Sequence, residues 1–413
     1  MKRETMDRDE FQKLYHDFQR GRISRRQLIQ VAGLGVASAI IAACAPTAAS
    51  PTPGATATTK PTEGATAAPT IDPTADWTPP AGVALGDTLI MTTWPNYHDP
   101  KTLDRFKELT GVTVQLNIKG SNEEMLAELL VGGTGWDVLV PTNYTFETYG
   151  SKSIVEKLDL TKIPRFDAAR YDARLLSPAF YPAGSTNQYG FNKDWGTTGF
   201  TVNTKHVTTP VTTWKEFFDR TQADLSGKVM IHDYQLTSIG SALVALGYSF
   251  NSVAEAELAK AEELLIAVKP HLFAITSDYQ PGMRSGDAWM TMTWTNDGVQ
   301  LHRDIPEIEY VIAADGGEIW SDFFAVVTGA PHREAAYAFL DFMATPKVMA
   351  QDAIFHGSPI LDSAGIALLP ASSTGNKISY PDAASLTKLE FGTAELLTNQ
   401  ARADLWARVK SSS

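Results

Sequence analysis

The stretch that decides the fold is DTLIMTTWPNYHDPKTLDRFKELTGVTVQLNI, residues 87–118, together with WDVLVPTNY at 136–144. Residues 88–92 form an apolar run typical of a buried strand. Asp99 and Pro100 are typical of the cap and first residue of a helix, and Gly111 suits its end. Alternation over 112–118 predicts a second strand, 123–131 a second helix, and 136–140 a third strand. This β-α-β-α-β order predicts an α/β fold with a mostly parallel sheet covered by helices.

The rest of the chain continues in the same style. We expect helices over 213–218, 254–267 and 333–343, and strands over 228–231, 290–294 and 308–313. In sheets of this kind, ligands bind beyond the carboxyl ends of the strands. The loops at 94–97 and 141–144 are therefore the first candidates for a binding site.

Length, charge and cysteine content exclude several classes of protein. The chain has 413 residues, 43% of them hydrophobic, which is enough for an N-terminal address and a body of two lobes. A net charge of −12 argues against a nucleic-acid partner. Cys44 is the only cysteine, so no internal disulfide forms, and the scattered histidines lack metal-ligand spacing. We expect no metal and no cofactor.

The N-terminus resembles an export and anchoring signal. Arg25 and Arg26 precede a 16-residue apolar run, 28–43, which ends in Ile41-Ala42-Ala43-Cys44. This order is typical of a bacterial lipoprotein signal of twin-arginine type, in which Cys44 receives the lipid. An uncleaved signal anchor is the alternative, but the run is short of the ~20 residues needed to cross a bilayer. We assign 1–44 to the signal peptide and 45–86 to a Pro/Thr/Ala-rich tether, and expect a lipid-anchored protein on the periplasmic or cell-surface side of the membrane.

Aromatic residues gather at the predicted strand ends and loops. They are Trp94, Tyr97, Tyr144, Trp294 and Trp320. Asp322 follows Trp320 by two residues, so on a strand both side chains would face one surface. Aromatic rings attract a cation through their quadrupoles, and a carboxylate accepts hydrogen bonds from an ammonium group. This combination predicts a site for a small organic cation.

Several motifs occur in a recognisable order. They are Trp94-Pro95-Asn96-Tyr97, Ser121-Asn122-Glu123-Glu124-Met125, the run 136–144, Thr293-Trp294, the run 316–322 and Tyr380-Pro381-Asp382-Ala383. In this order the chain resembles the spermidine/putrescine-binding proteins of bacterial ABC importers. The likeness extends from about Asp87 to the C-terminus.

The resemblance implies a two-lobed, periplasmic-binding-protein-like fold with a double hinge crossover and a ligand cleft between the lobes. Lobe one would hold 87–200 and 326–413, and lobe two 201–325, with crossings near 200–202 and 323–325. The lobes would close on the ligand by hinge motion. The resemblance further implies a monomer that delivers a polyamine to an ABC permease. The residues that match ligand contacts of the family are Trp94, Tyr97, Thr142, Tyr144, Trp294, Trp320 and Asp322.

The chain departs from the family pattern at several contact positions. Tyr234 and Thr237 stand where the family usually has carboxylates, so we count them as site residues of altered character. Asn96, Ser358 and Gly392 also differ from the usual residues. Because each buried ammonium needs a partner, one retained carboxylate does not account for a polyamine. Asp233, Glu123 and Asp278 are candidates to replace the missing carboxylates, and another amine or small solute stays open as the ligand.

Two other classes of function compete with transport. A chemosensory binding protein would share the fold and differ in its membrane partner. An extracellular enzyme is less favoured, because the sequence has no Gly-x-Ser-x-Gly, His-Glu-x-x-His or phosphate-binding loop motif. We therefore expect no catalytic residues.

Overall fold

A computed structural model describes residues 77–132, 134–172 and 188–412 of the chain. The predicted signal peptide, with Arg25, Arg26 and Cys44, lies outside these residues, as does most of the predicted tether. Trp77 lies inside them and is packed: its indole Nε1 donates to Asp341 at 2.8 Å, and its ring contacts Phe106 and Phe342. Packing into the body therefore includes Trp77, nine positions before the predicted end of the tether at 86, because an indole in that segment reaches the core.

The described strands form one mixed sheet. Their order is β2-β1-β3-β9-β4-β7-β5-β6, with β10 added to β9 and β8 to β4. The strands are β1 Thr88–Thr93, β2 Thr113–Ile118, β3 Val138–Leu139, β4 Phe191–Asn203, β5 Val229–Ile231, β6 Leu272–Ile275, β7 Met290–Trp294, β8 Ile308–Val311, β9 Gly317–Val326 and β10 Leu389–Phe391.

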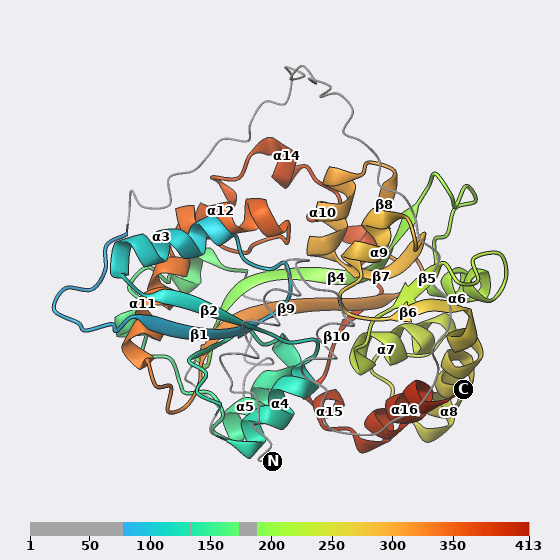
Figure 1. Cartoon of the computed structure of the whole chain (residues 1–413), viewed down its shortest axis with the longest axis horizontal. Helices are drawn as coiled ribbons and strands as arrows, with labels where there is room; N and C mark the ends of the chain where they lie inside the picture. Colours follow the sequence, from blue (N-terminus) through green and yellow to red (C-terminus); the bar gives the residue numbers. More distant parts are fainter. Residues whose placement is uncertain (1–76, 133, 173–187, 413) are drawn as a thin grey trace, which may run out of the picture. The chain divides into compact units, whose positions relative to one another are not determined.

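The two ends of the sheet are parallel and its middle is antiparallel. β1 pairs in parallel with β2 and β3, and β5 with β6 and β7. The long strands β4 and β9 run antiparallel to each other across the middle (Figure 1). The prediction of a parallel sheet thus holds at both ends. The middle differs because the chain passes from the first end to the second through β4 and returns through β9.

The shared stretch of β4 and β9 joins two lobes, the first built on β1–β3 and the second on β5–β7. It extends from the pair Phe191–Phe324 to the pair Thr198–Glu318. The predicted crossing residues lie at its two edges: Phe200 already pairs with β7 and β8 of the second lobe, and Ala325 pairs with β3 of the first.

Helices cover the sheet on both sides (Figure 1). They are α3 Pro100–Thr110, α4 Asn122–Val131, α5 Phe146–Ser151, α6 Trp214–Gln222, α7 Gln235–Ala245, α8 Glu255–Val268, α9 Gln280–Ser285, α10 Thr295–Asp304, α11 Arg333–Met343, α12 Pro346–His356, α13 Ser363–Ile366, α14 Ala371–Thr374, α15 Ala394–Leu397 and α16 Gln400–Ser411. The predicted ends of α3 are confirmed. The Asp99 side chain accepts from the Lys101 amide, Pro100 is the first helical residue, and Gly111 closes the helix at φ 79°.

One apolar cluster lies within the first lobe, and a larger one fills the second lobe and continues into the first through residues such as Leu139 and Phe146. Phe106 of α3 packs against Phe339 and Phe342 of α11 in the first lobe. Trp214 and Phe217 of α6 pack on Phe200 of β4 in the second.

The C-terminal helix packs differently from our expectation. We assigned 326–413 to the first lobe, and α11 and α12 do lie there. In contrast, α16 packs on α7 and α8 of the second lobe. Buried Arg402 of α16 ties it there by donating to the carbonyls of Phe250, Ser252 and Leu236. These polar groups can be buried because they form hydrogen bonds with one another. The sequence pattern did not indicate that α16 belongs to the second lobe.

Candidate functional site

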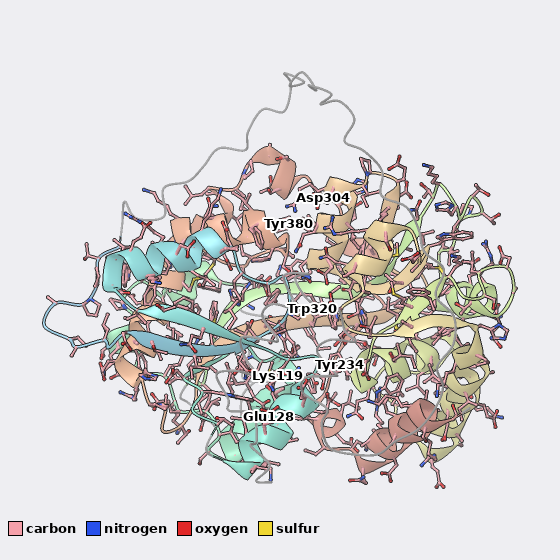
Figure 2. The ribbon with its side chains drawn as sticks, viewed as in Figure 1. Lys119, Glu128, Tyr234, Asp304, Trp320 and Tyr380 are labelled. Atoms are coloured by element: carbon pink, nitrogen blue, oxygen red, sulfur yellow. The ribbon has the colours of Figure 1, made fainter. Side chains whose placement is uncertain are left out.

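A small cavity opens where the two lobes meet along β9. Its volume is about 40 Å³, and its lining residues are Trp94, Pro95, Tyr97, Thr142, Tyr234, Trp294, Asn296, Glu318, Trp320 and Asp322. Figure 2 shows two of them, Trp320 and Tyr234, in the middle of the molecule near the long strands. One water needs roughly 10–15 Å³ on a comparable scale, so the cavity suits only a small solute.

The fold explains why these residues meet. Trp94 and Tyr97 follow β1, and Thr142 follows β3, at the carboxyl ends of parallel strands. Trp320 and Asp322 are two residues apart on β9 and both line the cavity, as the strand spacing predicted. The predicted aromatic residues are therefore brought together around Asp322, with the exception of Tyr144.

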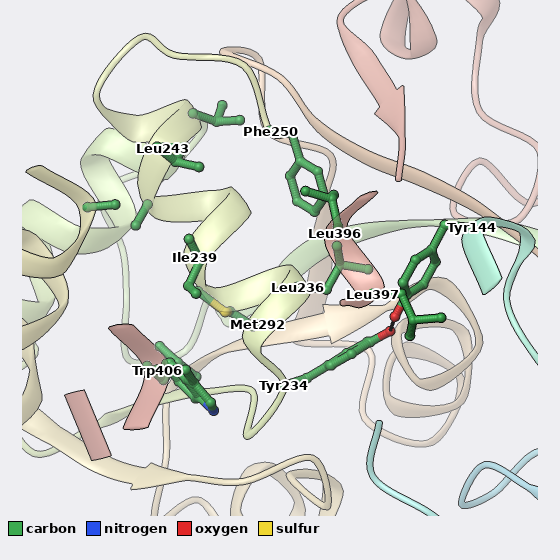
Figure 3. Close-up of a cluster of buried hydrophobic side chains, with 14 of the residues drawn as sticks. Tyr144, Tyr234, Leu236, Ile239, Leu243, Phe250, Met292, Leu396, Leu397 and Trp406 are labelled. Atoms are coloured by element: carbon green, nitrogen blue, oxygen red, sulfur yellow. Dashed lines mark hydrogen bonds between the residues drawn. The ribbon is translucent and has the colours of Figure 1, made fainter. Parts of the chain in front are cut away.

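Two predicted site residues do not line the cavity. Tyr144 lies behind Tyr234, and their hydroxyl oxygens are 2.5 Å apart (Figure 3). Thr237, on the first turn of α7, is fully buried and its hydroxyl lies 3.0 Å from Nδ1 of His232. Thr237 thus contributes to packing around His232 rather than to the cavity wall.

Asp322 lacks a cationic partner at the cavity. The Tyr97 hydroxyl donates to Asp322 Oδ2 at 2.8 Å and also contacts Asp194. Asp322 Oδ1 is buried, and none of the described residues gives it a hydrogen bond. Burial, reinforced by the negative charge of Asp194, raises the pKa of Asp322 to about 7. A bound ammonium group would compensate the buried negative charge and the unpaired oxygen of Asp322, because it supplies both positive charge and N–H donors.

Glu318 is a second carboxylate of the cavity, and our sequence analysis missed it. It is 2% exposed and accepts a hydrogen bond from the Thr198 hydroxyl at 2.5 Å. Burial raises its pKa to about 7. The signal was available, because residues 318, 320 and 322 share one face of a strand. The same rule that selected Trp320 and Asp322 also selects Glu318.

Aromatic rings form most of the remaining wall. Trp94 and Trp320 each bury an indole Nε1 that has no hydrogen-bond partner in the described part of the chain. Trp320 lies directly over β4, where a Cβ added to Gly196 would come within 2.5 Å of its ring. Only glycine allows this close approach, which presents the ring to the cavity. Trp294 lies against His232, with ring centroids 4.1 Å apart.

A lysine is buried on the other side of Tyr97. Lys193 Nζ lies 2.8 Å from Asp194, 3.5 Å from Asp352 and 3.9 Å from the centre of the Tyr97 ring. Burial, together with the carboxylates of Asp194 and Asp322, raises the pKa of Tyr97 well above its usual range, so its hydroxyl stays a donor. The protein thus already holds one ammonium between carboxylates and an aromatic ring.

Direct hydrogen bonds connect the lobes around Tyr234. Asn122 of α4 donates to the Tyr234 hydroxyl at 2.9 Å and to the Thr142 hydroxyl at 3.0 Å. Elsewhere between the lobes, Gln300 of α10 donates to the carbonyl oxygens of Asn96 and His356. These contacts hold the lobes together.

Among the described residues, no three His, Cys, Asp or Glu side chains are placed to hold a metal ion. In the same part of the chain, no helix has the length and apolar character needed to cross a membrane.

Two lobes that share long strands, with a polar and aromatic cavity between them, are the arrangement of a solute-binding protein. The model of the bacterial extracellular solute-binding protein family matches residues 101–364, more than half of the chain. The chain belongs to this family. Its role is extracytoplasmic solute binding for transport.

Similar proteins support the same assignment. The spermidine/putrescine-binding periplasmic protein of Salmonella typhimurium is 28% identical over 309 residues, covering 74% of this chain and 86% of its own length. A solved Listeria monocytogenes protein, described as a spermidine/putrescine ABC transporter, matches with a TM-score of 0.72 at 26% identity, covering 79% of this chain and 100% of its own. The solved lipoprotein Tp0655 of Treponema pallidum matches with a TM-score of 0.65 at 26% identity, and the match covers 78% of this chain and 99% of that protein. The resemblance and the fold class predicted from the sequence are confirmed.

Proposed function

We propose that this protein captures a short organic cation, a putrescine-like polyamine, and delivers it to an ABC permease in the membrane. The observation that carries the proposal is Asp322, a buried carboxylate without a cationic partner in a cavity walled by aromatic rings. An ammonium group placed there would face the carboxylate and the rings at once.

The second carboxylate favours a diamine over a monoamine. Glu318 lines the same cavity, and its described hydrogen-bond partner is the neutral hydroxyl of Thr198. Two buried carboxylates in one cavity repel each other, and two ammonium groups on a short chain would compensate both. The names of the similar proteins, which include spermidine and putrescine binding, agree with this chemistry.

Isothermal calorimetry on the exported protein carrying Cys44→Ser tests the ligand class. The panel holds putrescine, spermidine, propylamine, amino acids and sugars, and mass spectrometry checks each compound for turnover. Saturable binding of putrescine without turnover supports the proposal. Binding of a neutral sugar, with no amine bound, contradicts it.

We also propose that Cys44 carries the lipid that anchors the protein. The support is the Ile41-Ala42-Ala43-Cys44 sequence and the similarity to a Treponema pallidum lipoprotein. The wild-type protein should partition with membranes and show a lipid-modified mass that begins at Cys44, and Cys44→Ser should lack the lipid. A wild-type protein that carries no lipid and keeps residues 1–43 would instead support the uncleaved signal anchor.

A further inference from the structure

Tyr234 lies between two hollows of the molecule. On one side is the cavity of about 40 Å³ around Asp322. On the other is a groove of about 520 Å³, which we call the outer groove. Tyr234 lines it together with the charged residues Glu123, Glu124, Asp233 and Lys410.

Contacts from both lobes fix the Tyr234 ring as a wall between the hollows. The residue directly precedes α7, and its side chain is 6% exposed. Its hydroxyl lies 2.5 Å from that of Tyr144 and accepts from Asn122 at 2.9 Å. Figure 3 shows the Tyr234 and Tyr144 rings meeting hydroxyl to hydroxyl across the lobe boundary. The edge of its ring faces Trp294, 6.2 Å away between ring centres.

The outer groove contains one carboxylate that differs from its neighbours. Asp233 pairs with Lys410 at 3.1 Å, and Glu124 pairs with Lys119 at 3.5 Å. Glu123 has no ion pair within 4 Å in the described ranges, although the buried guanidinium of Arg402 attracts it from further away. Its Oε1 accepts from the Tyr144 hydroxyl at 3.2 Å, and its Oε2 is buried with no hydrogen-bond partner among them. A carboxylate that could receive an ammonium therefore lies just beyond the wall.

We propose that Tyr234 sets the length of the ligand: its ring confines a short ammonium compound to the inner cavity and separates it from Glu123 in the outer groove. Removal of the ring would join the two hollows, and Glu123 would then receive the far ammonium of a longer cation. This inference rests on the proposed function and deepens it, because it names the residue that selects short chains over long ones.

The test measures the affinity of each member of a series of linear diamines, from ethane-1,2-diamine to octane-1,8-diamine, and the affinity of spermidine. The wild type should bind a short member most tightly. Tyr234→Ala should move the maximum to a longer chain and improve the spermidine-to-putrescine affinity ratio at least tenfold. Tyr234→Phe keeps the ring and should keep the wild-type maximum. Adding Glu123→Gln to Tyr234→Ala should remove the gain for long chains.

Several results would overturn the proposal. An unchanged length maximum in Tyr234→Ala would show that the ring is no barrier, and a gain that survives Glu123→Gln would exclude Glu123 as the second partner. A wild type that prefers spermidine over every short diamine would contradict the length limit directly. A thermal melt of each variant confirms that it is folded before its affinities are compared.

A measurement without ligand separates this inference from the proposed function. Acrylamide quenching of tryptophan fluorescence should increase in Tyr234→Ala, and the increase should shrink when Trp320→Phe is added. If no amine binds the wild type, the proposed function fails, and quenching still decides whether Tyr234 closes the cavity. Equal quenching in wild type and Tyr234→Ala would overturn the wall itself.

Discussion

Asp194 and Asp322 both contact the hydroxyl of Tyr97, yet their surroundings differ in charge. Asp194 lies 2.8 Å from the ammonium of Lys193, and that ammonium also faces Asp352. Asp322 faces the cavity, where no basic side chain lies among the lining residues. Burial raises the pKa of both carboxyl groups. The positive charge of Lys193 opposes the shift at both, and it does so more strongly at Asp194, to which it is hydrogen-bonded, than at Asp322.

This difference assigns the two carboxylates to different roles, Asp194 to the stability of the fold and Asp322 to ligand binding. A buried charge is costly unless it is paired. At Asp194 the chain supplies the pair itself, so the group belongs to the folded core. At Asp322 the compensating charge is left to the ligand. The arrangement around Lys193, an ammonium between carboxylates and the Tyr97 ring, is an internal example of the chemistry proposed for the cavity.

The largest expected effect is the loss of binding in Asp322→Asn. Removing one partner of a buried charge pair costs about 3–5 kcal/mol, so putrescine affinity should fall more than a hundredfold. Calorimetry measures the affinity. The free energy of unfolding without ligand should stay equal or rise, because an uncompensated carboxylate is gone. If Asp322→Asn binds putrescine with wild-type affinity, Asp322 is not the partner of the ligand, and its assigned difference from Asp194 is wrong.

Asp194→Asn should do the reverse and lower stability. Lys193 would keep only Asp352, at 3.5 Å, so the free energy of unfolding should fall by about 3 kcal/mol in urea denaturation. Asp219→Asn is the matched control, because its pair with Lys215 is exposed and should change stability by less than ~0.5 kcal/mol. Equal stability of Asp194→Asn and wild type would show that Lys193 does not depend on Asp194.

The sequence predicted the first lobe better than the strands that join the lobes. The ends of α3 were readable because Asp99, Pro100 and Gly111 act locally. β4 was not predicted, since nearly all of its residues are buried on both faces and no alternation marks it. α7 was missed for the same reason, because it is buried on every side. Short apolar or alternating runs such as β5 and β7 can be read from sequence although they are buried, whereas β4 and α7 carry polar residues at buried positions and show no such run.

The candidate site divides in the same way. Trp320 and Asp322 followed from strand spacing, and Glu318 could have followed from it as well. The role of Asp194 could not be predicted, because the Tyr97 hydroxyl that contacts it is 97 positions away. Asp352, which shares the Lys193 ammonium with Asp194, is also distant, on α12. The placement of Tyr234 as a wall depends equally on Tyr144, which is 90 positions distant.

The pH dependence of binding should show which carboxylates must ionise. Asp322 and Glu318 have pKa values raised to about 7, so they are protonated below that pH and ionised above it. Alkyl ammonium groups stay charged up to about pH 10. Affinity for putrescine should therefore fall as the pH drops from 8 to 5.5, by up to about tenfold per pH unit for each group that must ionise. Asp322→Asn should flatten this dependence, whereas a flat wild-type profile would contradict the role of both groups.

The smallest expected effect comes from Trp320, one of the aromatic rings that line the cavity. Trp320→Leu keeps an apolar side chain but removes the ring quadrupole, which contributes about 0.5–2 kcal/mol to holding a cation. Putrescine affinity should fall roughly 2- to 30-fold, and Trp320→Phe should fall less because a weaker ring remains. Trp289→Leu is the matched control, since Trp289 stacks on His206, 4.7 Å between ring centres, and does not line the cavity. If both leucine variants bind equally well, the carboxylates alone hold the cation, and the wall around Asp322 acts only by excluding water.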